Sequence, residues 1–154
     1  MSRRQSREQA FALLFEKSFN DAPIMELAEG AQDARECILE PFALSLAQGA
    51  EEKLAELDAL IDTHSHKWSR DRISKVSLAV LRLAIYEMLH FEDVPANVAV
   101  SEAVRLTKKY DTDSAAFVNG ILGSYVRSTL SVDVSVDVEA EIPAVEAEPV
   151  PEEV

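Results

Sequence analysis

The apolar positions of this chain predict an all-helical protein built around one central helix. Between Ser74 and His90, apolar residues point in directions that cover nearly the whole circumference of a helix. An ordinary surface helix has one apolar stripe and one polar face. A short helix that is apolar nearly all round has to be covered by neighbours on nearly all sides. We therefore expect residues 74–90 to form the central helix, with the other helices packed around it.

The flanking segments carry the three-to-four-residue apolar spacing of amphipathic helices, and turn residues separate them. The predicted helices span residues 3–19, 24–39, 42–62, 97 to about 109, and 114–128. Residues 63–72 are expected to form a loop. In this loop Trp68 is expected to cover the bundle, and Ser69 to cap a short helical turn that leads into the central helix.

Caps and glycines refine these boundaries. Asn97 is expected to cap the helix that follows Pro95, and Thr112 or Asp113 to cap the last helix. Gly49 lies inside a predicted helix, where glycine costs about 1 kcal/mol relative to alanine. That cost indicates either a close helix contact or low local stability. Gly120 lies between two apolar ridges of the last helix, where a neighbouring backbone is expected to approach closely.

Three polar residues interrupt the central helix, namely Arg82, Tyr86 and Glu87. A cation at this depth needs a hydrogen-bonded anionic partner, and Glu102 and Glu87 are the candidates for Arg82. One interpretation is a structural ion pair that fixes how two helices dock. The other is that Glu87 reaches the surface and marks a site for a partner.

Charge divides the chain into two parts. The 154 residues carry a net charge of −13, and residues 131–154 hold eight acidic residues and no basic one. We interpret this stretch as a disordered acidic tail, because its alternating part has no partner strand. Residues 1–130 are expected to form one helical domain of ordinary size.

The charge of the domain is itself uneven. Residues 16–62 have a net charge of −9, whereas the rest of the domain has a net charge of +4. Such asymmetry indicates a charged partner. No apolar stretch is long enough to span a membrane, no signal peptide is evident, and the single Cys37 cannot form an internal disulfide. A cytoplasmic protein is expected.

Catalytic patterns are missing from the sequence. It contains no glycine-rich phosphate loop and no nucleophile in a recognisable triad. His64 and His66 are two residues apart, but no third ligand follows at a spacing typical of metal sites. We therefore expect a binding module rather than an enzyme, without metal or cofactor.

Three groups of basic residues indicate a nucleic-acid ligand. They are Arg3, Arg4 and Arg7; Lys67, Arg70, Arg72 and Lys75; and Arg105, Lys108 and Lys109. The last group leads into Tyr110 and, seven residues on, Phe117. Positive charge beside exposed rings suits single-stranded RNA, whose unstacked bases stack on aromatic side chains. Phe117 also fits an apolar core stripe, so a structural role for it stays open.

Four motifs resemble the NusB family of transcription antitermination factors. They are R-x-x-R-x-x-A-x-x-x-L-F at 4–15, V-L-R-L-A-I-Y-E-M-L at 80–89, D-V-P-A-N-V-A-V-S-E-A-V-R-L-T-K-K-Y at 93–110, and D-S-A-A-F-V-N-G-I-L at 113–122. Their order and spacing cover nearly all of residues 3–130. The resemblance implies an all-α helical bundle in which two three-helix subdomains surround a central helix, and it excludes the tail.

The same resemblance implies a function. It implies binding of single-stranded boxA RNA as a heterodimer with NusE, a small-subunit ribosomal protein. It also implies membership of the antitermination complex of RNA polymerase, which keeps transcription of ribosomal RNA going past terminators. Both a monomer and a homodimer are compatible with it. The alternatives are a helical adaptor that binds only proteins and the RNA-binding domain of an RNA methyltransferase. The latter is disfavoured because no cofactor-binding domain follows residue 130.

Site residues follow by position in the motifs. The RNA-binding residues implied by the resemblance are Arg3, Arg4, Arg7, Lys108, Tyr110, Asp113 and Phe117. The three arginines would contact phosphate. The carboxylate of Asp113 would accept a hydrogen bond from a base amino group. It would therefore select which base is bound rather than attract the RNA as a whole. Phe15 and Glu87 match positions that face NusE.

Overall fold

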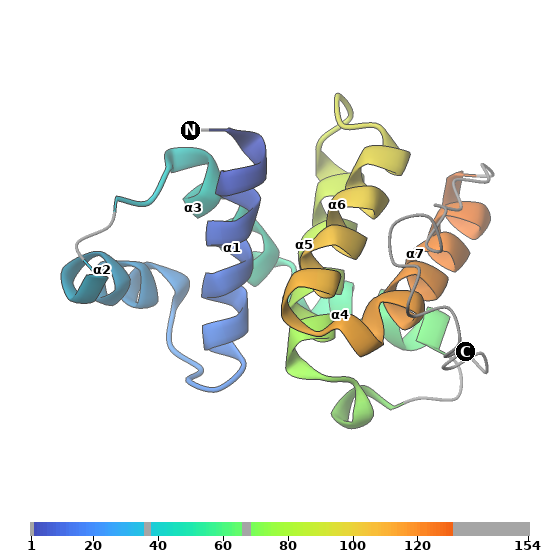
Figure 1. The fold of residues 1–154 in the computed structure, drawn as a ribbon, viewed down its shortest axis with the longest axis horizontal. Helices are drawn as coiled ribbons and strands as arrows, with labels where there is room; N and C mark the ends of the chain where they lie inside the picture. Colours follow the sequence, from blue (N-terminus) through green and yellow to red (C-terminus); the bar gives the residue numbers. More distant parts are fainter. Residues whose placement is uncertain (1, 36–37, 66–68, 131–154) are drawn as a thin grey trace.

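The computed structural model describes residues 2–35, 38–65 and 69–130, and all regular structure in these residues is helical (Figure 1). The elements in chain order are α1 (Arg3–Lys17), α2 (Ile24–Arg35), α3 (Pro41–Glu52), α4 (Leu54–Ser65), η1 (Arg70–Arg72), α5 (Lys75–His90), α6 (Ala96–Tyr110), η2 (Thr112–Ser114) and α7 (Ala115–Leu130), where η denotes a 3-10 helix. The predicted all-α class is confirmed. No helix among the described residues is both long and apolar enough to cross a membrane.

Helix α5 is the central element, as predicted. It begins after Ser74, whose side chain accepts a hydrogen bond from the backbone N–H of Ser77, and it packs against α1, α3, α4, α6 and α7. Only its end residues Lys75 and His90 are exposed. Burial on nearly every side explains why its apolar residues cover most of the helix circumference.

Two groups of three helices surround α5. Helices α1, α2 and α3 pack on one another, while α4 and α6 both pack on α7. Figure 1 shows α1 facing α5 and α6 where the two groups meet. This arrangement agrees with the subdomains implied by the resemblance. We call the surface where α1 and α6 face each other the seam.

The predicted helix over 42–62 is in fact two helices. The chain leaves helical geometry at Lys53, where φ is −108° and ψ is 18°. Helix α3 packs mainly on α1, whereas α4 packs on α7 and α5. One straight helix could not bury its stripe against neighbours in both subdomains, so the break redirects the chain while the apolar spacing continues across it.

The predicted loop over 63–72 is partly helical, because α4 continues through Ser65. His64 is buried, with its Nδ1 2.8 Å from Ser124 Oγ and its ring edge-on to Tyr125. Ser69 occupies the N-cap of the short helix η1 as expected, but its hydroxyl makes no capping hydrogen bond and donates to the Asp71 carboxylate instead. The predictions for Cys37, Trp68 and the tail 131–154, together with residues His66 and Lys67, lie outside the described residues.

Helix ends differ from the prediction at three places. Helix α2 ends at Arg35 rather than Leu39. Pro95, not Asn97, occupies the N-cap of α6, with extended backbone at φ −63° and ψ 145° and without a side-chain capping hydrogen bond. Thr112 does not cap α7, because its hydroxyl donates to the carbonyl of Lys108 and closes the end of α6.

The two glycine predictions had different outcomes. Gly49 marks a close helix contact, because a Cβ at this position would collide with the Tyr86 ring of α5. Gly120 is exposed, and a Cβ there would meet nothing within 4 Å. The prediction of a close backbone approach at Gly120 was therefore wrong, since this side of α7 faces solvent.

Neither expected partner of Arg82 is its partner. Its Nε and Nη2 donate to the two carboxylate oxygens of Asp58 at 2.8 and 3.0 Å. Asp58 also accepts from Arg70 at 2.8 Å, and thereby ties η1 and α5 to α4. The prediction of a structural ion pair was right, but the carboxylate comes from α4, which packs directly against this side of α5.

Candidate functional site

The three N-terminal arginines of α1 contact different parts of the protein. The guanidinium of Arg3 lies 3.8 Å from the centroid of the Phe42 ring. Arg4 crosses the seam and donates to Glu102 at 2.9 Å. Arg7 points inward and donates through Nε to Glu87 at 2.7 Å. Their different directions around α1 place these side chains over α3, α6 and α5, so they do not form one phosphate-binding patch.

The Arg7–Glu87 pair is enclosed between α1, α5 and α6. The side chains of Arg7 and Glu87 are 9% and 1% exposed. Burial raises the pKa of Glu87 above its ordinary value, and this effect exceeds the lowering by the hydrogen bond and charge of Arg7. In this structure, neither side chain reaches the surface where RNA or a protein partner would contact it. The pair fixes α1 against α5.

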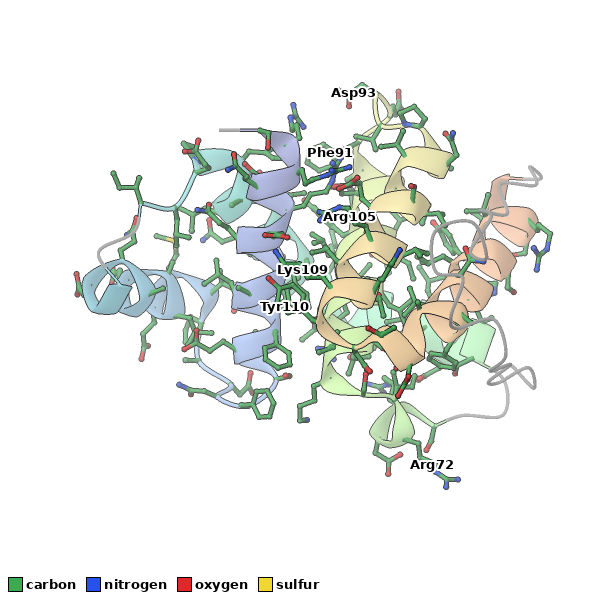
Figure 2. The ribbon with its side chains drawn as sticks, viewed as in Figure 1. Arg72, Phe91, Asp93, Arg105, Lys109 and Tyr110 are labelled. Atoms are coloured by element: carbon green, nitrogen blue, oxygen red, sulfur yellow. The ribbon has the colours of Figure 1, made fainter. Side chains whose placement is uncertain are left out.

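Charges of alternating sign line the seam, in an arrangement we call the seam row. Glu102 accepts from Arg4 at 2.9 Å and from Arg105 at 3.2 Å. Glu8 accepts from Lys109 at 2.9 Å and lies 3.5 Å from Arg105. The row therefore reads Arg4, Glu102, Arg105, Glu8, Lys109. In Figure 2, Arg105, Lys109 and Tyr110 follow one another along the seam.

Both carboxylates of the seam row are held ionised by their neighbours. Partial burial alone would raise the pKa of Glu8, but the hydrogen bond from Lys109 and the charges of Lys109 and Arg105 outweigh it and lower the pKa. The same balance lowers the pKa of Glu102, where Arg4 and Arg105 overcome the effect of burial. The hydrogen bond to Glu8 is the main cause that raises the pKa of Lys109.

Aromatic rings continue from the end of the seam row along α1. Tyr110 is 48% exposed and stacks on Phe11 with 5.1 Å between centroids. Phe15 stacks on Phe11 at 5.7 Å and meets Phe19 edge-on at 5.1 Å. Phe15 itself is half-buried, whereas Phe19 is 66% exposed. The last turns of α1 thus present a partly exposed apolar surface.

A cleft of about 170 Å³ lies between η1, η2 and the first turns of α5 and α7. Its lining residues are Arg72, Ile73, Ser74, Ser77, Asp113, Ser114 and Phe117. Asp111 holds its two sides together, because its Oδ2 accepts from Ser74 at 2.8 Å and from Ser114 at 2.7 Å. The cleft combines hydroxyls, an exposed carboxylate and one aromatic ring.

The predicted RNA-binding residues are thus only partly brought together. Asp113 and Phe117 line one cleft. Phe117 is otherwise a core residue at 8% exposure, so its structural role is confirmed, while its contact with RNA stays a prediction. Tyr110 ends α6 directly before η2, and Lys108 is half-buried on the same helix. Arg3 and Arg4 lie at the opposite end of the seam from Tyr110, because α1 begins there.

The sequence-based prediction did not include the carboxylates of the seam row among the site residues. Glu8 lies four residues after Arg4, and Glu102 lies three residues before Arg105. These spacings place each pair on one helix face. The sequence therefore shows each spacing, but it does not show that the two helix faces lie opposite each other across the seam.

The sequence of this chain is similar to those of one family of known proteins. The model of the NusB family matches residues 4–127. The chain is 41% identical over 125 residues to the transcription antitermination protein NusB of Bacillus subtilis (strain 168), covering 80% of this chain and 94% of the relative. It is 38% identical over 133 residues to the protein of the same name from Clostridium novyi (strain NT), covering 83% of this chain and 100% of the relative.

Solved structures show the same likeness. T. maritima NusB superposes with a TM-score of 0.72 at 34% identity, covering 82% of this chain and 92% of that one. A chain from the crystal structure of antitermination factors NusB and NusE in complex with dsRNA superposes with a TM-score of 0.73 at 25% identity, covering 82% and 96%. The chain therefore belongs to the NusB family of transcription antitermination proteins.

Proposed function

We propose that this protein binds single-stranded boxA RNA as a heterodimer with the ribosomal protein NusE. In this way it supports processive transcription of ribosomal RNA operons. The observation that carries the proposal is the cleft between η1 and η2, where Asp113 and Phe117 lie together at the end of α6 that Tyr110 occupies. A solved complex of NusB, NusE and double-stranded RNA supports RNA and NusE as the two kinds of partner.

The cleft has the chemistry of a base-recognition site. A splayed base of single-stranded RNA needs an aromatic surface and hydrogen-bonding groups for its edge. Phe117 offers an aromatic ring, the Asp113 carboxylate would accept from a base amino group, and the Ser77 hydroxyl can donate or accept. Tyr110 and Lys108, on the last turn of α6, would hold the neighbouring nucleotides, and Arg3 and Arg4 would contact phosphate at the other end of the seam.

Phe15 is proposed to face NusE. Its ring lies between those of Phe11 and Phe19, and Phe19 extends the apolar surface into solvent. Aromatic anchors of this kind are typical of protein interfaces. The buried pair of Arg7 and Glu87 enters the proposal as a positioning device, because it fixes the helix that carries Arg3, Arg4 and Phe15. The role requires RNA polymerase, so we place the protein in the cytoplasm.

The test is fluorescence anisotropy with a labelled boxA RNA and a scrambled RNA of equal length, with and without NusE, at two salt concentrations. The expected result is a preference for boxA that strengthens when NusE is added. Equal weak binding to both RNAs, unaffected by NusE, would overturn the proposal and leave a helical adaptor that binds only proteins.

Two variants test whether RNA binds at the proposed residues. Asp113→Asn should alter the preference for boxA over the scrambled RNA, because the carboxylate is replaced by a group that also donates. Lys108→Gln should weaken the binding of both RNAs together, as expected for a phosphate contact. Lys53→Gln is the matched control, since it removes one exposed charge at the break between α3 and α4.

A further inference from the structure

The seam row contains three basic groups, and each of them is paired with a carboxylate of the same protein. Arg4 binds Glu102, Lys109 binds Glu8, and Arg105 lies between the two carboxylates. Two of these pairs connect residues about one hundred positions apart, on α1 and α6. The basic groups are therefore aligned by tertiary structure and neutralised by it at the same time.

Exposure shows which members of the row a ligand can reach. The side chains of Arg4 and Lys109 are 60% and 51% exposed, whereas Glu102 is 12% exposed. Arg105 and Glu8 are about one quarter exposed. Arg4 and Lys109 therefore face solvent, while Glu102 lies beneath Arg4. An anion that approaches from solvent meets these two cations first.

The row also lies where an RNA strand would run. Lys109 is adjacent to Tyr110 and its Nζ lies 5.3 Å from the centroid of the Tyr110 ring. The other end is Arg4, in the first turn of α1. Arg105 and Lys109 follow one another toward Tyr110 along the seam (Figure 2), so the phosphates of a strand whose bases stack at Tyr110 would pass these cations.

We propose that Arg4, Arg105 and Lys109 form a phosphate-binding row for the RNA backbone, and that Glu8 and Glu102 are built-in competitors which RNA phosphates displace. The inference rests on the proposed function, since it assumes that RNA is the ligand. It adds Arg105 and Lys109 to the binding residues and assigns two acidic residues an opposing role. Exposed ion pairs are individually weak, so a polyanion with several phosphates is able to exchange with them.

Displacement has a measurable signature in salt dependence. Each phosphate neutralised by a free cation on single-stranded nucleic acid contributes a slope of about −0.7 to the plot of log affinity against log salt. A cation that already holds a carboxylate contributes less. Removal of one carboxylate should therefore steepen the slope by up to about 0.7 and, extrapolated from 1 M salt, raise the affinity about fivefold at 0.1 M salt.

The experiment measures RNA affinity from low to high salt for the wild type, Glu8→Gln, Glu102→Gln and the double variant. Glu26→Gln is the control with the same change in net charge, on the exposed surface of α2 away from the seam. The expected result is tighter binding and a steeper slope for Glu8→Gln and Glu102→Gln than for Glu26→Gln. Equal affinities and slopes in all three would overturn the inference and leave the row as a link between helices only.

A second set of variants protects the test from changes in folding. Arg105→Gln and Lys109→Gln should each flatten the salt slope relative to Lys53→Gln, while urea unfolding confirms that all variants are folded. Slopes equal to that of Lys53→Gln would overturn the inference. The outcomes are distinct from failure of the proposed function, which is read from the preference for boxA over scrambled RNA, whereas the slope is read with either RNA.

Discussion

Two sets of ion pairs join α1 to α5 and α6, and they differ in exposure. Arg7 and Glu87 are enclosed in the interior, whereas Arg4 and Lys109 of the seam row have more than half of their side chains exposed. Both sets pair a basic side chain with a glutamate. In the interior the two charges bind each other away from solvent, whereas at the seam water competes for both partners and an anionic ligand competes for the cations. The count of arginines in the sequence therefore overstates the charge available to RNA.

The largest expected effect comes from breaking the interior pair. Arg7→Met leaves Glu87 buried without a partner, which should lower the free energy of unfolding by about 3–5 kcal/mol. Arg4→Gln should change it by less than about 1 kcal/mol, because its pair is exposed. Urea denaturation monitored by circular dichroism measures both variants.

A double variant checks the reason for that loss. Arg7→Met combined with Glu87→Leu removes both charges and should recover part of the stability. Equal stability of Arg7→Met and Arg4→Gln would contradict the distinction between interior and seam.

The next largest effect is expected from breaking the second interior pair, between Arg82 and Asp58. Asp58→Ala removes the carboxylate that holds Arg82, whose side chain is 12% exposed, and should cost about 3 kcal/mol. Asp62→Ala is the matched control, because Asp62 binds the half-exposed Arg70 and is itself 48% exposed; it should cost about 0–1 kcal/mol. Thermal unfolding of both variants gives the comparison, and a loss for Asp62→Ala as large as for Asp58→Ala would count against it.

Glycine substitutions extend the comparison to packing. Gly49→Ala places a methyl group against the Tyr86 ring, and the overpacking should cost about 1–3 kcal/mol. Gly120→Ala, in an exposed helix position with nothing within 4 Å, should instead stabilise by about 0.5–1 kcal/mol. Urea unfolding distinguishes the two signs. Stabilisation by Gly49→Ala would show that Tyr86 moves aside without cost.

The smallest expected effect is a difference in pH dependence. The pKa of Glu102 is lowered in the folded state, so its stabilising contribution is present above its ordinary value of 4.5 and is lost as pH falls. The pKa of Glu87 is raised, so its contribution is greatest at low pH and declines as pH rises above 4.5.

Stability of the wild type relative to Glu102→Gln should therefore increase between pH 4 and 7, by about 1 kcal/mol or less. Stability relative to Glu87→Gln should decrease over the same interval. Urea unfolding at several pH values checks both trends. Two trends of the same sign would contradict the contrast between the buried and exposed carboxylates.

Part of the candidate site was predictable from the sequence. The motif at 113–122 placed Asp113 and Phe117 close together, and both line the cleft, Asp113 from η2 and Phe117 from the first turn of α7. The motif at 4–15 indicated the arginines of α1 but not their directions. Arg7 was predicted to contact phosphate, and only the packing of α1 on α5 shows that it points inward.

The sequence by itself determined the central helix, the helical spacing of its neighbours and the family, because these depend on local periodicity and on motifs that are continuous in the chain. The tertiary structure alone decided which charge meets which. Arg82 and Asp58 are 24 residues apart, Arg7 and Glu87 are 80 apart, and Arg4 and Glu102 are 98 apart. Several carboxylates were equally available to each arginine along the sequence. The choice among them depends on how the helices pack, which also sets whether a pair lies buried or remains open to RNA.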